Sequence, residues 1–254
     1  MFGVGIDSGS TTTKGLVYDG KNIIKKIMVP TGPNPKRTIK ELYHSLTDEI
    51  SEPFYCISTG YGRNLLEAAD KRVTEITCHG KGASYLCPDV TAVIDIGGQD
   101  SKVMTLNENQ NVQDFLMNDK CAAGTGRFLE MLSRILHEDL EDLDKVVAGG
   151  KAIKISSMCT VFAESEVISL LAEDVPAADI ALGVVTSICE RTANFAGRLS
   201  IGDKIFFSGG LSKFDCINNY LEKALNKELV THPMGQYAGA IGAAILGFER
   251  LVKS

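Results

Sequence analysis

The sequence has no surplus of basic residues, because its 254 residues include 26 Lys and Arg against 32 Asp and Glu, a formal net charge of −6. A protein that neutralises nucleic-acid phosphates or anionic lipids needs such a surplus, so we expect no nucleic-acid partner and no membrane partner. No segment approaches the roughly eighteen uninterrupted apolar residues of a membrane span. Residues 1–7 read directly into a strand, so we expect no signal peptide and a cytoplasmic protein.

Two common motifs are also missing. The seven cysteines never form Cys-x-x-Cys, the usual spacing of single-chain zinc and ferredoxin sites. The P-loop sequence Gly-x-x-x-x-Gly-Lys-Ser/Thr does not occur. In a reducing cytoplasm the cysteines are not expected to form a disulfide framework. The composition is otherwise that of an ordinary globular chain, 44% hydrophobic and 23% charged, long enough for one large domain or two.

An internal repeat organises the chain. Asp7, Gly9 and Lys14 recur as Asp95, Gly97 and Lys102, each 88 residues later. Each copy starts a strand–turn–strand–turn–strand pattern, which is typical of an antiparallel meander. The repeat therefore predicts two similar subdomains facing each other across a cleft, at residues 1–91 and 92–254, and the final helix is a candidate to pack back on the first.

Helical periodicity follows each meander. We expect helices at residues 35–50, 70–86, 126–136, 159–176, 180–199, 214–225 and 237–252, and further strands at residues 55–60 and 204–208. The coarse prediction is an α/β fold in which a β-meander and an α/β segment occur twice.

The repeated loop suits a nucleotide phosphate tail. Gly9 allows backbone N–H groups to approach phosphate oxygens, and the hydroxyls of residues 10–13 and the Lys14 ammonium add donors. Asp7 and Asp95, related by the pseudo-twofold, could hold Mg²⁺ through water. One such loop alone would be interpreted as a polar turn, but two copies at a fixed offset favour a nucleotide site.

These residues resemble the superfamily of acetate and sugar kinases, heat-shock chaperones and actin, over essentially the whole chain. Residues 5–14 and 94–102 resemble its two phosphate motifs, and residues 206–211 its adenosine motif. Residues 78–83 and 238–244 resemble its two small-residue helices, which cross closely at an interdomain hinge. The resemblance implies a duplicated actin-like (ribonuclease H-like) ATPase fold with two subdomains around a nucleotide cleft.

Two cysteines, Cys121 and Cys159, each stand immediately before an expected helix. The helix dipole and free N–H groups at such a position stabilise a thiolate. The alternative is that both are ordinary buried thiols, which is our interpretation of Cys56 and Cys189.

A narrower resemblance involves both cysteines. Residues 118–128 and 159–167, together with residues 58–64 and 95–100, resemble the activators of 2-hydroxyacyl-CoA dehydratases, of the BadF/BadG/BcrA/BcrD type. ATPase subunits of benzoyl-CoA reductases and activators of double-cubane-cluster proteins are close relatives. The resemblance implies that Cys121 and Cys159 ligate iron. A [4Fe–4S] cluster takes four thiolates and one chain supplies two, so it implies one cluster on the twofold axis of a homodimer.

The function implied is that of an ATP-hydrolysing one-electron carrier. It would accept an electron from reduced ferredoxin or flavodoxin and pass it to a partner iron–sulfur dehydratase or reductase. The expected catalytic residues are Asp7, Asp95 and Gln99, with Gln99 placing the attacking water. The expected residues for ATP or ADP and Mg²⁺ are Gly9, Ser10, Thr11, Thr12, Thr13, Lys14, Gly97, Gly98, Gln99, Gly209, Gly210 and Gln236.

Two other functions use the same fold. A kinase of a sugar or short-chain acid would contain inert, buried cysteines and a separate Asp general base, for which the sequence shows no constellation. A chaperone-like or sensor ATPase would use nucleotide to move domains for binding alone.

Overall fold

The computed structural model describes residues 1–157 and 159–253 and has two compact units. Unit 1 comprises Met1–Val93, Met104–Phe115 and His232–Ser254; unit 2 comprises Ile94–Val103 and Leu116–Thr231. The C-terminal residues thus belong to the same compact unit as the N-terminal residues. The division into subdomains at residue 91 stays a prediction, since compactness is a different criterion from sequence repetition.

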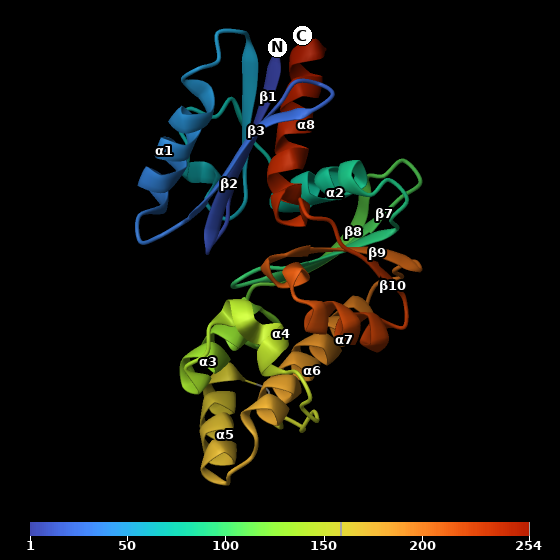
Figure 1. The fold of residues 1–254 in the computed structure, drawn as a ribbon. Helices are drawn as coiled ribbons and strands as arrows, with labels where there is room; N and C mark the ends of the chain where they lie inside the picture. Colours follow the sequence, from blue (N-terminus) through green and yellow to red (C-terminus); the bar gives the residue numbers. More distant parts are fainter. Residues whose placement is uncertain (158, 254) are drawn as a thin grey trace. The chain divides into compact units, whose positions relative to one another are not determined.

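Each half of the chain begins with three consecutive strands, and helices follow them (Figure 1). The strands are β1 (Phe2–Ser8), β2 (Thr12–Tyr18), β3 (Ile23–Pro30), β4 (Phe54–Thr59), β5 (Lys71–Arg72), β6 (Ala92–Ile96), β7 (Ser101–Leu106), β8 (Val112–Asn118), β9 (Lys204–Gly209) and β10 (Glu228–Val230). The α-helices are α1 (Pro35–Thr47), α2 (Glu75–Leu86), α3 (Gly126–Leu136), α4 (Leu143–Val146), α5 (Thr160–Ala172), α6 (Ala177–Ala196), α7 (Asp215–Leu225) and α8 (Ala238–Val252). Short 3₁₀ turns used below are η2 (Ala122–Gly124), η4 (Gly210–Lys213) and η5 (Gly235–Tyr237).

The two sheets have the same strand order. The first runs β3-β2-β1-β4-β5, and the second, taken from its other edge, runs β8-β7-β6-β9-β10. In the first sheet β1 pairs antiparallel with β2 and parallel with β4. The sequence repeat is therefore a structural duplication, and the chain has the α/β, duplicated actin-like fold.

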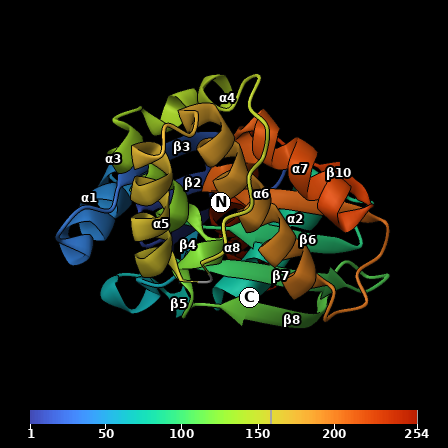
Figure 2. The same ribbon diagram turned by 90° about the horizontal axis from the view of Figure 1, so that it is seen from below.

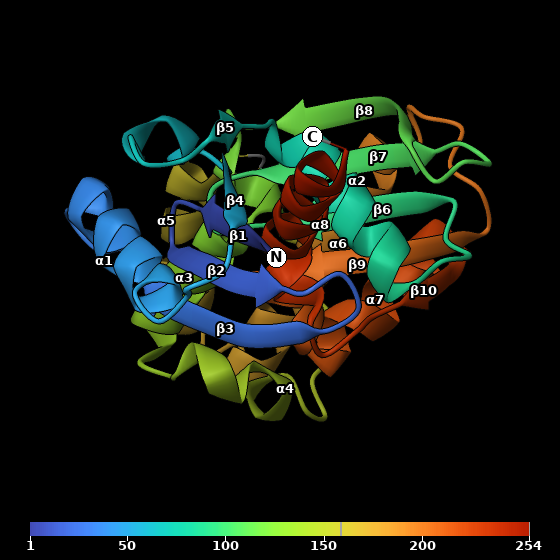
Figure 3. The same ribbon diagram turned by 90° about the horizontal axis from the view of Figure 1, so that it is seen from above.

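Strand alternation distributes the core of unit 1 over both faces of the first sheet. Val4, Ile6 and Val17 pack against α1, whereas Leu16 and Tyr18 pack against α8. Figures 1 and 3 show α1 and α8 on opposite sides of β1 and β2. Gly5 of β1 faces α8, where any Cβ would overlap the Ala240 carbonyl oxygen. The strand and α8 therefore approach more closely than a side chain would permit.

The helices α2 and α8 cross with their backbones in contact. A Cβ on Gly82 would overlap the Ala238 carbonyl oxygen, and a Cβ on Gly242 would overlap that of Cys78. The small residues in both helices are therefore a packing requirement, as the sequence predicts for this pair. Their action as a hinge stays a prediction.

Several helix boundaries differ from the expected ones. The helix expected at residues 70–86 begins at Glu75, because residues 71–72 pair with β4 and the Thr74 hydroxyl caps the helix by accepting the Thr77 N–H. The helix expected to reach residue 176 ends at Ala172, two residues before Asp174 takes a positive φ of 59°. In the described part of the chain no helix combines the length and the apolar character needed to cross a membrane.

Candidate nucleotide and cluster sites

The first repeated loop connects β1 to β2, and its shape is set by internal hydrogen bonds. The Gly9 N–H donates to the Thr12 carbonyl at 3.1 Å. The Thr31 hydroxyl donates to the Gly9 carbonyl at 2.8 Å and lies 3.0 Å from the Thr13 hydroxyl. With these groups occupied, Ser10 is half-buried and Thr11 exposed at the tip of the loop, where they can meet a ligand.

Asp7 lies just before this loop and is only 4% exposed. Its carboxylate fits between Gly60 and Gly239, where a Cβ on either glycine would collide with it. Lys14 is directly opposite Asp7 in the antiparallel β1–β2 pair, so the two side chains are on the same face. Within residues 1–157 and 159–253, no acidic group is ion-paired with Lys14, whose ammonium is thus available to an anion.

The Ser8 hydroxyl, next to Asp7 in the chain, is another group of unit 1 that could donate a hydrogen bond to a ligand or to water. Ser8 is 1% exposed, and its Oγ finds no hydrogen-bond partner in the part of the chain that the structure describes. A buried hydroxyl without a partner is costly, and a bound ligand or water would relieve that cost.

The second repeated loop connects β6 to β7 with the same turn. The Gly97 N–H donates to the Asp100 carbonyl at 2.9 Å, which is the Gly9–Thr12 bond repeated 88 residues later. Asp95 accepts a hydrogen bond from the Ser208 hydroxyl at 2.7 Å. Lys102 lies 3.4 Å from Asp95 and 2.8 Å from Asp100 and is 4% exposed. Lys102 is thus held in a buried ion-pair network, a structural role that the matching sequence position does not reveal.

The other predicted nucleotide residues are distributed over the two units. Gln99 is exposed at the tip of the second loop, next to the half-buried Gly97 and Gly98. Gly209 ends β9 with a φ of 91°, and a Cβ there would collide with the Ile96 carbonyl oxygen beside Asp95. Gly210 is exposed at the start of η4 in unit 2, whereas Gln236 is half-buried in η5 of unit 1.

Cys121 and Cys159 are both exposed, and each occupies the N-cap position of a helical segment. Cys121 precedes η2, which leads into α3, and Cys159 is the N-cap residue of α5. The helices α3, α5 and α6 pack against one another within unit 2, and Figures 1 and 2 show α3 and α5 side by side. Both thiols therefore belong to one helical layer, in the free and accessible state that metal binding requires.

The other cysteines are of a different kind. Cys56, Cys78, Cys189 and Cys216 are buried, and Cys87 is half-buried. Burial raises the pKa of the Cys56, Cys78 and Cys189 thiols to about 12, and burial together with Asp144 raises that of Cys216. These four thiols are held in the protonated form, which is a poor metal ligand.

The donor set of one chain is incomplete for a cluster. Among the described residues, no group of three or more His, Cys, Asp and Glu side chains is arranged to hold a metal ion. Two exposed thiols are fewer than the four thiolates that a [4Fe–4S] cluster takes.

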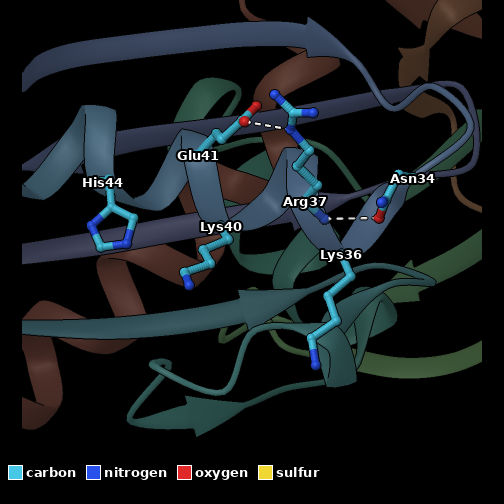
Figure 4. Close-up of a pocket in the computed structure, with 6 residues that line it drawn as sticks. All are labelled: Asn34, Lys36, Arg37, Lys40, Glu41 and His44. Atoms are coloured by element: carbon cyan, nitrogen blue, oxygen red, sulfur yellow. Dashed lines mark hydrogen bonds and ion pairs between the residues drawn. The ribbon is translucent and has the colours of Figure 1, made fainter.

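Two surface grooves of unit 1 do not contain the predicted site residues. One, of about 440 Å³, runs along α1 and is lined by Asn34, Lys36, Arg37, Lys40, Glu41 and His44 (Figure 4). Several of its polar groups already have partners: Asn34 caps α1 by accepting the Arg37 N–H, Arg37 pairs with Glu41 at 2.7 Å, and Lys36 pairs with Glu67 at 2.8 Å. The other, of about 270 Å³, lies beside α8 and includes Leu246 and Arg250.

The chain matches one known protein family over nearly its whole length. Residues 4–247 match the BadF/BadG/BcrA/BcrD ATPase family. The chain belongs to this family. The BadF/BadG/BcrA/BcrD ATPases similar to it include Escherichia coli (strain K12) YjiL, 49% identical over 97% of this chain and 96% of that protein. Another is the (R)-2-hydroxyglutaryl-CoA dehydratase activating ATPase of Acidaminococcus fermentans, 42% identical over 100% and 99% of the two chains.

A solved structure extends the family likeness to the fold. The activator of 2-hydroxyisocaproyl-CoA dehydratase from Clostridium difficile, with bound ADPNP, superimposes with a TM-score of 0.91 at 36% identity, covering 100% of this chain and 96% of that one. Kinases of the ROK family, at 13% identity and TM-scores of 0.57 and 0.59, share the fold alone. The chain is thus a BadF/BadG/BcrA/BcrD ATPase whose full-length relatives include activators of 2-hydroxyacyl-CoA dehydratases.

Proposed function

We propose that this ATPase is a one-electron donor that carries one [4Fe–4S] cluster per homodimer and activates a 2-hydroxyacyl-CoA dehydratase. The alternative partner, which would receive the electron in the same way, is a related iron–sulfur reductase such as a double-cubane-cluster protein. Reduced ferredoxin or flavodoxin would supply the electron. The observation that carries the proposal is the pair of exposed thiols, Cys121 and Cys159, on packed helices of a chain that resembles dehydratase activators throughout.

The nucleotide role is supported by the two loops. Lys14 offers a positive charge to phosphate oxygens, and the hydroxyls of Ser10 and Thr11 offer hydrogen-bond donors. The carboxylates of Asp7 and Asp95 are buried, each in close contact with its own unit, and each would offer Mg²⁺ an oxygen ligand, directly or through water. The amide of Gln99, exposed at a loop tip, is suited to orient the attacking water.

The cluster role is supported by the surroundings of the thiols. When bound, the cluster would supply a carrier for one electron. Cys121 and Cys159 would hold it from each chain, since the other thiols are buried or half-buried. Val161 and Phe162, which follow Cys159, are 69% and 70% exposed. Apolar side chains so exposed beside a candidate ligand favour a second copy of the chain as the cover.

Cysteine variants test this proposal. We expect Cys121→Ser and Cys159→Ser each to lose the iron of the whole dimer, because each removes two of four ligands from a twofold-symmetric site. Cys189→Ser is the matched control, since its buried thiol is expected to leave iron content unchanged. The measurement is iron per chain and the visible absorbance of anaerobically purified protein, with ATP binding followed in parallel. A full cluster in either ligand variant contradicts the proposal.

A further inference from the structure

The segment that carries Cys121 is hydrogen-bonded to the second phosphate loop at its C-terminal end. The Gly126 N–H donates to the Gly97 carbonyl at 2.9 Å, and the Arg127 N–H donates to the Gly98 carbonyl at 3.0 Å. These are donors of the first turn of α3, which have no partner within the helix. The loop itself therefore caps α3.

The same segment also contacts β7 at its other end, through Asn118. The Asn118 side chain accepts the Cys121 N–H at 3.0 Å and donates to the Cys121 carbonyl at 2.9 Å. Its amide nitrogen also lies 3.5 Å from the hydroxyl of Ser101, the first residue after the second loop. Residues 118–127 are thus attached to the loop region on both sides of Cys121.

The segment before Cys159 is held by other groups. The Glu166 carboxylate accepts the Ser156 N–H at 2.7 Å and the Ser157 N–H at 2.8 Å, and Arg191 donates to the Ser157 carbonyl at 3.1 Å. In the described part of the chain no hydrogen bond runs from residues 156–172 to the loop at residues 97–100. Among the described residues, the Cys159 segment is therefore bonded to α6 through Arg191 and meets the loop-bound α3 through the packing of α5 on α3.

We infer that nucleotide acts on the two cysteines unequally: the phosphate loop positions Cys121 directly, and Cys159 stays with α5 and α6. Gly126 and Asn118 are the positioning residues of this coupling. The inference rests on the proposed binding of nucleotide phosphate by the second loop. A ligand shifts a structure only through contacts that differ between its states, and the carbonyls of Gly97 and Gly98 connect such contacts to α3.

Hydrogen–deuterium exchange on the full-length, anaerobically purified protein tests the inference, with ADP and with ADPNP, a non-hydrolysable ATP analogue. We expect exchange in residues 118–127 to differ between the two nucleotides by about three- to tenfold, the size expected for one net hydrogen bond. Exchange in residues 156–162 should change by less than half as much on a logarithmic scale.

Two glycine variants provide a matched pair. A Cβ on Gly126 would lie 3.3 Å from the Gly97 carbonyl oxygen, so Gly126→Ala pushes α3 away from the loop. A Cβ on Gly124 would meet only the Asn118 amide nitrogen, at 3.8 Å. We expect Gly126→Ala to lose the response of residues 118–127 while nucleotide still protects residues 9–14, and Gly124→Ala to keep the response. Ser101→Ala, which removes only the hydroxyl near Asn118, should weaken it.

The outcomes separate this inference from the proposed function. If neither nucleotide protects residues 9–14 or 97–100, the nucleotide site is wrong and the inference falls with it. If the loops respond but residues 118–127 and 156–162 change equally, or Gly126→Ala responds as the wild type does, the unequal coupling is wrong and the nucleotide site stands. The comparison of segments in the wild type needs no variant to fold.

Discussion

At the scale of single residues, the two repeated carboxylates are stabilised in different ways. Asp95 is buried, where the Lys102 ammonium balances its negative charge and the Ser208 hydroxyl donates a hydrogen bond to its carboxylate. Asp7 is equally buried, but the lysine facing it, Lys14, is half-buried at the loop. Lys102 is thus held in ion pairs, whereas no such pair involves Lys14 among the described residues.

This difference gives a test of the nucleotide site. We expect Lys14→Ala or Asp7→Ala to lower ATP turnover by a factor of about 100 or more, the usual effect of removing a charge-stabilising group. Iron content and dimer mass should not change, since neither residue is near the thiols in sequence. Lys25→Ala, which removes a half-buried lysine of β3 that is paired with Glu49, is the control and should turn over ATP normally. Turnover at the wild-type rate in the Lys14 variant would remove that loop from the site.

The buried thiols predict a dependence of stability on pH. Burial raises the pKa of Cys189 from 9.0 to about 12, so this contribution to stability is complete below pH 9 and is lost as the pH rises toward 12. For one thiol the loss between pH 8 and pH 10 should be about 1 kcal/mol. Urea unfolding of wild type and Cys189→Ala at both pH values measures it. An identical pH dependence in the two proteins would show that the thiol is not held protonated.

At the scale of elements, the sequence predicted the strands around both loops and the cores of the helices, because turn residues and apolar periodicity are local signals. The helix expected at residues 126–136 is confirmed as α3. Local signals could not predict β10 or the pairing of residues 71–72, since these short strands are defined by neighbours. The same limit applies to the site: the cradle of Gly60 and Gly239 around Asp7 is formed by three distant segments.

The crossing of α2 and α8 gives a prediction at this scale. Gly242→Ala places a methyl group on the Cys78 carbonyl, so we expect a loss of about 1–3 kcal/mol in the free energy of unfolding. Gly197→Ala, at the end of α6, meets its nearest atom at an ordinary 3.4 Å and should be neutral or slightly stabilising. Thermal melts of both variants compare the two positions. Equal melting temperatures would mean that the helices separate easily to admit a side chain.

At the scale of the whole molecule, the duplication includes the two repeated loops but not the two exposed cysteines. The sheets repeat the strand order, and the loops repeat the Gly9–Thr12 bond as Gly97–Asp100. The cysteine segments lie in the helical layer of unit 2, outside the repeated pattern. Under the proposed function, a second copy of the chain would supply the other two of four thiolates, and the proposed dimer and the proposed electron-carrying role would then depend on each other.

The decisive measurement for a shared cluster is its stoichiometry. Iron, acid-labile sulfide and native mass should be measured on the same anaerobically purified sample. A cluster shared by two chains predicts about four iron and four sulfide for every two chains, in a dimer. A full cluster in each monomer, or a dimer that remains free of iron after anaerobic reconstitution with iron and sulfide, would contradict the shared cluster.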